Sequence, residues 1–225
     1  MERILELKSV SKNFKSNDIL NEIDFSLNSG EVFALLGHSG VGKSTIIKMI
    51  TGEILPNKGN IFLFGKNISS LKSNDYKRIG VVTDNTALYE DFTAYYNLLI
   101  FARMFKIDKQ KIEILLDTVG LSSDAKKKVK SFSKGMKQRL LIARAILHSP
   151  EIIFLDEPTD GLDINSIKTI HNIILELKKQ DTAVFLITHN IDETIKVADK
   201  IGILHEKHIV GVDKSKIEIE KLLLV

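Results

Sequence analysis

Residues Glu31 to Ile50 read EVFALLGHSGVGKSTIIKMI and carry the strongest indication of the fold. The first six of them, 31–36, are mostly apolar and predict a short buried strand. A glycine-rich segment follows at 37–42, and from 43 to 50 the apolar side chains recur at helical spacing. Strand, glycine-rich loop and helix therefore follow one another without a break.

Residues 37–45, GHSGVGKST, match the pattern G-x-x-x-x-G-K-[ST]. Glycines let backbone N–H groups turn toward phosphates, and the positive end of the following helix adds to the attraction. We expect Lys43 to reach the β- and γ-phosphates of a nucleotide and the Ser44 hydroxyl to bind Mg²⁺. The predicted nucleotide-binding loop comprises Gly37, His38, Ser39, Gly40, Val41, Gly42, Lys43, Ser44 and Thr45, with no separate role for His38.

A second stretch, residues 152–157, reads IIFLDE. It is an apolar strand that ends in Asp156 and is followed at once by Glu157. Ligands of open α/β sheets bind at the carboxyl ends of the strands. We therefore expect Asp156 to hold Mg²⁺ through water and Glu157 to polarise an attacking water molecule. Taken alone, such a pair is usually a strand that meets a solvated turn; together with the phosphate loop it indicates a nucleotide site.

The rest of the chain alternates between two patterns. Apolar residues at period two predict strands at 4–10 and 23–27, and beyond Pro150 buried strands alternate with amphipathic helices. We therefore expect an α/β fold: a P-loop NTPase core with a mostly parallel sheet, an N-terminal antiparallel β subdomain and an inserted helical subdomain. The expected bounds are a single domain over 1–225, a nucleotide-binding core at 1–85 and 148–225, a helical subdomain at 86–147 without obvious strands, helices at 94–105, 111–119, 164–179 and 191–198, and strands at 152–155 and 183–188.

Composition excludes several functions. The chain has 225 residues and a net charge of only +3, from 32 basic and 29 acidic side chains, so no basic surface for nucleic acid is expected. It contains no cysteine, which excludes disulfides, thiolate metal sites and cysteine catalysis. The longest apolar runs are far shorter than the roughly 18 residues of a membrane helix. We expect a cytoplasmic protein that meets the membrane only through a partner.

Further motifs follow the order of a known family. Residues 131–140 read SFSKGMKQRL, residues 160–163 read DGLD, and Thr188 and His189 end a predicted strand. Along essentially its whole length the chain resembles the ATP-binding subunits of ABC transporters. In that family the first segment corresponds to the signature, the second to the D-loop and His189 to the switch histidine. Phe14 lies where the family places an aromatic ring against adenine.

The resemblance implies a head-to-tail dimer that binds ATP and Mg²⁺. Each ATP would lie between the phosphate loop of one subunit and the signature helix of the other. From the residues alone, Ser133 as a helix cap leaves two interpretations equally open, an anion-binding helix end and an ordinary capped core helix. The resemblance implies catalytic roles for Lys43, Glu157 and His189, metal contacts from Ser44, Asp84 and Asp156, and further nucleotide contacts from Phe14, Asp84, Ser133, Gly135, Met136, Asp156 and Asp163.

Two departures from the family pattern bear on the mechanism. The signature has Lys134 and Met136 where the family commonly has glycine and glutamine, while Ser133 and Gly135 are kept. Asp84 stands where the family places a metal-contacting glutamine. A carboxylate also binds Mg²⁺, but its stem is shorter and it adds a charge. This replacement bears on how hydrolysis is coupled to the helical subdomain.

The amino-acid sequences around Asp84 and in the signature segment look like those of exporter-type subunits that handle drugs, antimicrobial peptides or sodium. This implies a polytopic membrane subunit as partner and a second ATPase subunit, most simply a second copy. Six aromatic residues between 89 and 105 fit a groove for the membrane partner, with Tyr89 and Phe92 expected in the groove and most of the others in the core. Two alternatives are an ABC ATPase without a membrane partner and, because of Asp84, a regulatory module with poor hydrolysis. The sequence predicts no cargo.

Overall fold

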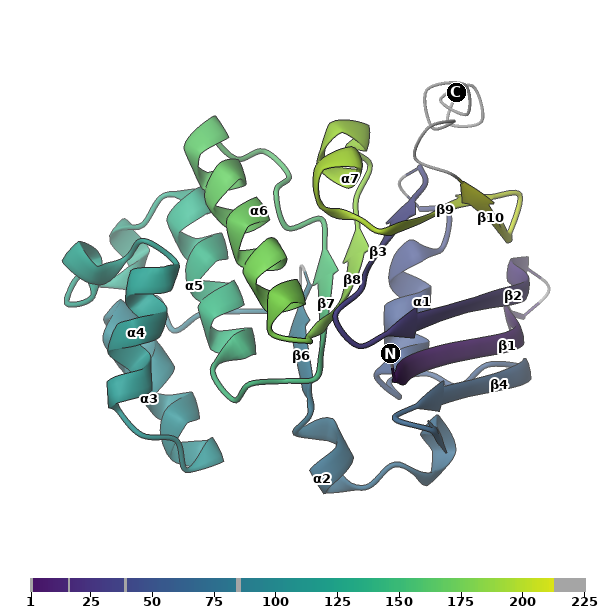
Figure 1. The fold of residues 1–225 in the computed structure, drawn as a ribbon, viewed down its shortest axis with the longest axis horizontal. Helices are drawn as coiled ribbons and strands as arrows, with labels where there is room; N and C mark the ends of the chain where they lie inside the picture. Colours follow the sequence, from purple (N-terminus) through teal and green to yellow (C-terminus); the bar gives the residue numbers. More distant parts are fainter. Residues whose placement is uncertain (1, 16, 39, 84–85, 213–225) are drawn as a thin grey trace.

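The computed structural model describes residues 2–15, 17–38, 40–83 and 86–212, which form two β-sheets and a set of helices. Figure 1 shows a helical region at one end of the molecule, a four-stranded sheet at the other and a six-stranded sheet between them. Among the predicted site residues, Ser39 and Asp84 lie outside the described residues.

The six-stranded sheet has the order β10-β9-β3-β8-β7-β6. All neighbouring strands are parallel except β10, which runs antiparallel to β9. Because β3, β7 and β8 are buried along their whole length, their sequences are almost continuously apolar instead of alternating. The strands are β3 (Val32–Leu36), β6 (Ile79–Val82), β7 (Ile152–Asp156), β8 (Ala183–Ile187), β9 (Lys200–His205) and β10 (His208–Val212).

The parallel register brings the carboxyl ends of three central strands together. Ile187 of β8 is level with Leu35 of β3 and with Asp156 of β7. The three segments that leave these strands therefore start side by side. They are the phosphate loop, the segment that follows Asp156 and the segment that carries His189. We call this end of the sheet the carboxyl edge.

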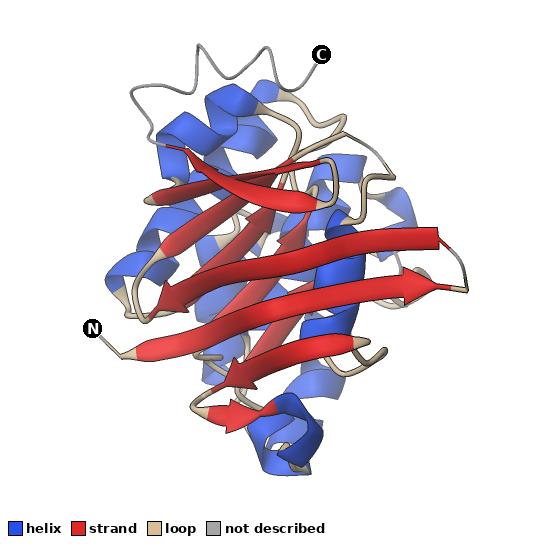
Figure 2. Ribbon diagram, turned by 90° about the vertical axis from the view of Figure 1, so that its right-hand side faces the viewer, coloured by secondary structure: helices blue, strands red, loops and turns tan. Residues whose placement is uncertain are grey.

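The four-stranded sheet is antiparallel, with the order β2-β1-β4-β5, and Figure 2 shows it lying across the central sheet. Its inner side chains share one hydrophobic core with helix α1 and one face of the central sheet, as Leu5, Ile46 and Phe185 illustrate. These elements are β1 (Arg3–Phe14), β2 (Asn17–Asn28), β4 (Lys58–Leu63), β5 (Lys66–Asn67) and α1 (Lys43–Ile50).

Helices α3 to α7 share a second core with the other face of the central sheet, whereas no residue of the short α2 belongs to that core. Each of α3, α5 and α6 begins at a side chain that caps it: Thr93, Ser133 and Asp163 accept the N–H of the residue three positions on. The helices are α2 (Ser73–Tyr76), α3 (Ala94–Phe105), α4 (Gln110–Thr118), α5 (Lys134–Ile146), α6 (Ile164–Lys179) and α7 (Ile191–Val197), with 3-10 turns at Ile68–Ser70, Ser122–Asp124 and Val129–Ser131.

The architecture confirms the fold expected from the sequence. The mostly parallel core sheet, the antiparallel sheet and the helical region are all present. The predicted helices lie within one residue of the observed bounds. Strands β4, β5, β6, β9 and β10 were not predicted. Over the part of the chain that the structure describes, no helix combines the length and apolarity needed to span a bilayer.

Candidate nucleotide-binding site

The phosphate loop joins β3 to α1 at the carboxyl edge. Gly40 and Gly42 have φ angles of 80° and 116°, in the region that favours glycine. A Cβ atom at Gly42 would lie 2.8 Å from Ile19 Cγ2, so β2 also leaves no room for a side chain there. The conformation and packing of the loop therefore both explain its glycines.

Lys43 is held inside this loop. Its ammonium donates to the carbonyl oxygens of Gly37 and His38, at 2.5 and 2.9 Å, and lies 3.7 Å from Glu157 Oε1. The side chain is only 5% exposed. Burial lowers the pKa of Lys43 below its ordinary value, although the carboxylates of Glu157 and Asp156 act in the opposite direction. An anion that entered the loop would stabilise this poorly solvated charge.

Ser44 and Asp156 face each other across the edge. Ser44 Oγ donates to Asp156 Oδ2 at 2.8 Å, and Asp156 is buried at the end of β7. A hydroxyl and a carboxylate are hard oxygen ligands, which suit Mg²⁺. Mg²⁺ commonly takes one or two protein ligands and completes its shell with water and substrate phosphates. The pair fits that ion, although no cluster of three or more His, Asp or Glu side chains with metal-binding geometry occurs among the described residues.

Glu157 and His189 meet at the mouth of the loop. Glu157 Oε2 lies 2.5 Å from His189 Nδ1, so one carboxylate faces both the histidine and Lys43. The backbone holds this pair in place, because Glu157 N donates to Ile187 O at 2.9 Å. Glu157 also has a φ of 48°, a left-handed conformation that is strained for a residue with a side chain. The three predicted catalytic residues therefore form one connected group.

Two adjoining cavities open at this group. The first, of about 310 Å³, is lined by the phosphate loop together with Asp156 and Glu157. The second, of about 370 Å³, shares both carboxylates and extends past His189 to α5. Lys134, Gln138 and Asp160 line it and were not predicted as site residues. The spacing of Lys134 and Gln138 by four residues on one helix was the signal available in the sequence.

The structure of α5, the helix of the signature segment, explains why serine and glycine occur at positions 133 and 135. Ser133 Oγ accepts the N–H of Met136 at 3.2 Å and so caps α5. A Cβ atom at Gly135 would lie 2.2 Å from Ser166 Oγ, so close packing of α5 against α6 requires glycine. Met136 is half-buried against the core. Lys134 Nζ lies 3.5 Å from Asp160 Oδ2 on the exposed side.

Several predicted nucleotide contacts lie apart from the cavity at the phosphate loop. Ser133, Gly135, Met136 and Asp163 are not among its lining residues, as far as the structure describes the chain. Asp163 accepts Ser166 N at 2.9 Å and Ser166 Oγ at 2.7 Å, and these hydrogen bonds lower the pKa of its carboxyl. Phe14 is the last residue of β1, pairs with Asn17 and is 48% exposed. Lys12 Nζ lies 5.0 Å from the centre of the Phe14 ring.

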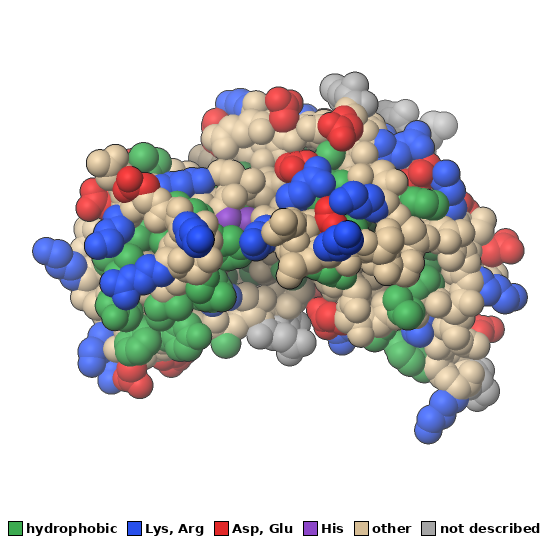
Figure 3. Space-filling view, turned by 90° about the horizontal axis from the view of Figure 1, so that it is seen from below, with side chains coloured by type: hydrophobic (Ala, Val, Ile, Leu, Met, Phe, Trp, Pro, Cys, Tyr) green, Lys and Arg blue, Asp and Glu red, His purple; other side chains and the backbone are tan. Residues whose placement is uncertain are grey.

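An aromatic cluster lies on the surface of the helical region. Tyr89, Phe92 and Tyr96 are 51, 43 and 44% exposed, with ring centroids 5.7 Å apart for the first pair and 5.3 Å for the second. Tyr89 and Phe92 were predicted to lie in a groove for the membrane partner, and Tyr96, in the first turn of α3, was not singled out but is exposed beside them. Figure 3 shows hydrophobic side chains gathered over this end of the molecule. We call Tyr89, Phe92 and Tyr96 the aromatic cluster.

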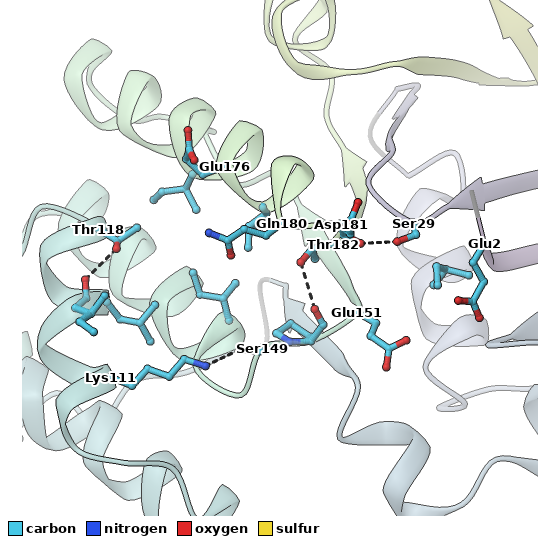
Figure 4. A pocket seen from close by; sticks show the side chains of 17 residues that line it. Glu2, Ser29, Lys111, Thr118, Ser149, Glu151, Glu176, Gln180, Asp181 and Thr182 are labelled. Atoms are coloured by element: carbon cyan, nitrogen blue, oxygen red, sulfur yellow. Dashed lines mark hydrogen bonds between the residues drawn. The ribbon is translucent and has the colours of Figure 1, made fainter.

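A further cavity, of about 500 Å³, lies away from the carboxyl edge, between the helical region and the ends of β1 and α6 (Figure 4). Its polar side chains are mostly bonded within the protein. Lys111 Nζ donates to Ser149 Oγ at 2.5 Å, and Thr182 Oγ1 to Pro150 O at 3.4 Å. No predicted site residue lines this cavity.

Comparisons with known proteins agree with this geometry. The family model described as "ABC transporter" matches residues 20–160. The bacitracin transport ATP-binding protein BcrA of Bacillus licheniformis is 38% identical over 208 residues, which is 92% of this chain and 68% of that protein. The lantibiotic transport ATP-binding protein SrtF of Streptococcus pyogenes is 35% identical over 207 residues, which is 92% of this chain and 89% of that protein.

Solved structures give the same result. The ATP binding subunit of an ABC transporter superposes with a TM-score of 0.85 at 28% identity, covering 98% of this chain and 94% of that chain. The structure of cbiO1 from Clostridium perfringens superposes with a TM-score of 0.86 at 26% identity, covering 98 and 92%.

The chain belongs to the ATP-binding subunits of ABC transporters. It is the subunit that binds and hydrolyses ATP, and its family works with a membrane permease.

Proposed function

We propose that this chain hydrolyses ATP at the carboxyl edge and thereby drives an exporter. The observation that carries the proposal is the meeting of Lys43, Glu157 and His189 at the mouth of the phosphate loop. A triphosphate in the loop brings its β- and γ-phosphates to the Lys43 ammonium, which then exchanges carbonyl oxygens for phosphate oxygens. Backbone N–H groups of the loop bind the phosphates, and we assign Ser39 to the same loop on the sequence motif alone.

Hydrolysis itself needs a positioned water molecule. The Glu157 carboxylate accepts a hydrogen bond from that water and takes its proton as the oxygen attacks the γ-phosphorus. The bond between the γ-phosphorus and the bridging oxygen breaks, and ADP and inorganic phosphate leave. His189, beside Glu157, donates to the γ-phosphate and so registers whether it is present.

Ser44 and Asp156 are the residues that would hold Mg²⁺, which when bound neutralises charge on the β- and γ-phosphate oxygens. Ser44 supplies a hydroxyl oxygen, and the buried Asp156 carboxylate acts through an intervening water. We assign Asp84 a third contact to the same ion on sequence grounds.

The second subunit completes the site. We propose a head-to-tail pair of identical chains in which the capped N-terminus of α5, with Ser133, Gly135 and Met136, meets the ATP of the other chain. The exposure of Ser133 at a helix N-terminus supports this, because such an end attracts anions. Asp163, at the start of α6, contacts the nucleotide across the same interface, and Phe14 stacks on the adenine.

The domain organisation is a further part of the proposal. We propose one ATPase domain over 1–225, with its nucleotide-binding core at 1–85 and 148–225 and its helical subdomain at 86–147. The latter range contains α3, α4 and α5, which supports the division.

The aromatic cluster supports contact with the membrane subunit. Exposed aromatic side chains are typical anchors of protein interfaces. We propose that Tyr89, Phe92 and Tyr96 receive a helix of the polytopic partner, which places this chain at the cytoplasmic face of the membrane. Because its relatives include bacitracin and lantibiotic transport proteins, we propose a peptide antibiotic as cargo.

Replacement of Glu157 by Gln tests the catalytic proposal. The variant should bind ATP normally, while turnover falls by about 100-fold or more because the general base is lost. It should also accumulate as an ATP-bound dimer on size-exclusion chromatography. Glu176→Gln, at an exposed glutamate of α6, is the control and should hydrolyse ATP at the normal rate. Normal turnover by Glu157→Gln would contradict the assignment, and equal inactivity of the unmutated protein would favour a regulatory module.

A further inference from the structure

A buried glutamate lies behind the carboxyl edge. Glu193 is in the first turn of α7, and its side chain is only 1% exposed. Burying a carboxylate is costly unless its oxygens accept hydrogen bonds. Glu193 lines neither cavity of the carboxyl edge. Its carboxylate is instead surrounded by other side chains of the protein.

Three side chains from three different segments supply the hydrogen bonds. Thr188 Oγ1 donates to Glu193 Oε2 at 2.6 Å, and Thr159 Oγ1 donates to Oε1 at 2.9 Å. His171 Nε2, from the middle of α6, lies 3.3 Å from the same Oε1. All three partners are buried as well. The carboxylate therefore ties the end of β8, the segment after β7 and helix α6 to one point on α7.

The Thr188 hydroxyl has a fixed direction in this network. Its oxygen accepts the backbone N–H of Asn190 at 3.0 Å, so its hydrogen is left for Glu193. The atom of residue 193 that faces Thr188 must therefore be an acceptor. A carboxylate satisfies this requirement with either oxygen, whereas the amide nitrogen of a glutamine does not.

Two of the tied residues are next to the catalytic pair. Thr188 directly precedes His189, and Thr159 follows Glu157 by two residues. The half-buried Glu157 and the exposed His189 contact each other at 2.5 Å. Any slip between the two segments would change that contact.

We propose that Glu193 is a positioning residue for ATP hydrolysis: by holding Thr159 and Thr188 to α7, it sets the distance between Glu157 and His189. The inference rests on the proposed roles of Glu157 and His189 in hydrolysis. Glu193 acts from behind the site and needs no contact with ATP.

Single hydroxyl deletions test the inference. Thr188→Val and Thr159→Val each remove one bond to Glu193 at almost constant volume, and each should lower kcat by about tenfold or more while KM for ATP changes by less than about twofold. Thr188→Ser and Thr159→Ser keep the hydroxyl and should restore kcat. Thr182→Val is the matched control: Thr182 is equally buried and loses a hydrogen bond in the distant cavity, and kcat should stay unchanged.

A second readout reports position without turnover. The ring signals of His189 in an NMR spectrum, assigned by their loss in His189→Ala, should shift in Thr188→Val and in the volume-preserving Glu193→Gln, and stay in place in Thr182→Val. Unchanged kcat in both valine variants, unmoved His189 signals, or an equal loss of kcat in Thr182→Val would overturn the inference. Inactivity of the unmutated protein would instead count against the proposed function, and the His189 signals would still decide the positioning role.

Discussion

The carboxyl edge and the helical region position their functional groups by different means. At the carboxyl edge, strand register, glycine conformations and buried hydrogen bonds fix Lys43, Asp156 and Glu157 within one chain. The helical region instead presents a capped helix end at Ser133 and the exposed aromatic cluster, groups that face outward. Catalysis therefore depends on the interior of one chain and recognition depends on its surface, so substitutions should affect the two separately.

The largest effect should come from the carboxyl edge. Lys43→Ala removes the only ammonium that the described residues place inside the phosphate loop. We expect weaker ATP binding and a loss of turnover of about 100- to 1,000-fold, because a preorganised cation for the phosphates is gone. Lys48→Ala, on the exposed side of the same helix, should have normal kinetics in the same ATPase assay. Undiminished turnover by Lys43→Ala would refute the phosphate-loop assignment.

The signature helix should come next. Ser133→Ala or Gly135→Ala would be hard to interpret, because Ser133 caps α5 and Gly135 packs on Ser166. Ser133→Asp keeps the cap, since Asp serves as well as Ser, but sets a negative charge at the proposed ATP contact. Unit charges about 4 Å apart repel by about 4 kcal/mol at an effective dielectric constant near 20.

We therefore expect Ser133→Asp to weaken ATP-driven dimerisation by about 100-fold or more, measured by size-exclusion chromatography in the Glu157→Gln background. The uncharged Ser133→Asn, which also caps the helix, should dimerise far better. Equal dimerisation of the two variants would argue that this helix end does not meet a phosphate.

A smaller effect is expected from the aromatic cluster. Phe92→Ser removes the central ring of the three and should reduce recovery of the membrane subunit by about tenfold, because aromatic anchors dominate interfaces. The measurement is copurification of the partner from native cells in mild detergent. ATP hydrolysis by the isolated chain should be unchanged. Val210→Ser, at an exposed apolar residue of β10, is the control; equal recovery with both variants would exclude the aromatic cluster as the docking surface.

The smallest effect concerns the joint between the two regions. His148 donates through Nε2 to Ile79 O at 3.0 Å and stacks on Phe105 of α3, while its buried Nδ1 has no partner among the described groups. Burial lowers the pKa of His148 below its ordinary 6.5, with nearby Lys111 acting the same way and the bond to Ile79 opposing. Below pH 6.5 the unfolded chain therefore binds more protons at this residue than the native protein does.

The free energy of unfolding should consequently fall as the pH drops from 6.5 toward the native pKa of His148. His148→Gln keeps a donor for Ile79 O but does not titrate, so its stability should fall less over the same range. Denaturant titrations at pH 7.5 and 5.5 measure the difference. If the free energy of unfolding fell equally in the unmutated protein and in His148→Gln, other titratable groups would control the loss of stability at low pH.

The sequence predicts those parts of the fold whose signal is local. The phosphate loop, the buried strands β7 and β8 and the capped helices α3 and α6 carry their patterns within a few residues. Strand β4 has three exposed residues at its start and β5 has only two residues in all, so neither shows a period of two. Their pairing with β1 and with each other depends on contacts distant in sequence.

The site shows the same limit. Motif spacing leads to Lys43, Asp156, Glu157 and His189, which the structure brings together. It does not reveal that Glu193 collects Thr159, Thr188 and His171, because those residues come from three segments and form no pattern. Nor does it reveal that Gly135 is required by Ser166, thirty-one positions away along the chain. Such tertiary contacts override any local preference.

At Glu157, thermal stability and ATP turnover make opposite demands on one residue: the left-handed backbone conformation favours glycine, whereas the proposed hydrolysis needs the carboxylate. A glutamate with a φ of 48° stores about 1–3 kcal/mol of strain, which a glycine would not carry. That is a sizeable share of the roughly 5–15 kcal/mol by which folded domains are stable. A library of variants sorted only for survival at high temperature would therefore gather glycine at residue 157 and lose ATP hydrolysis on the way, so any such selection must score both properties together.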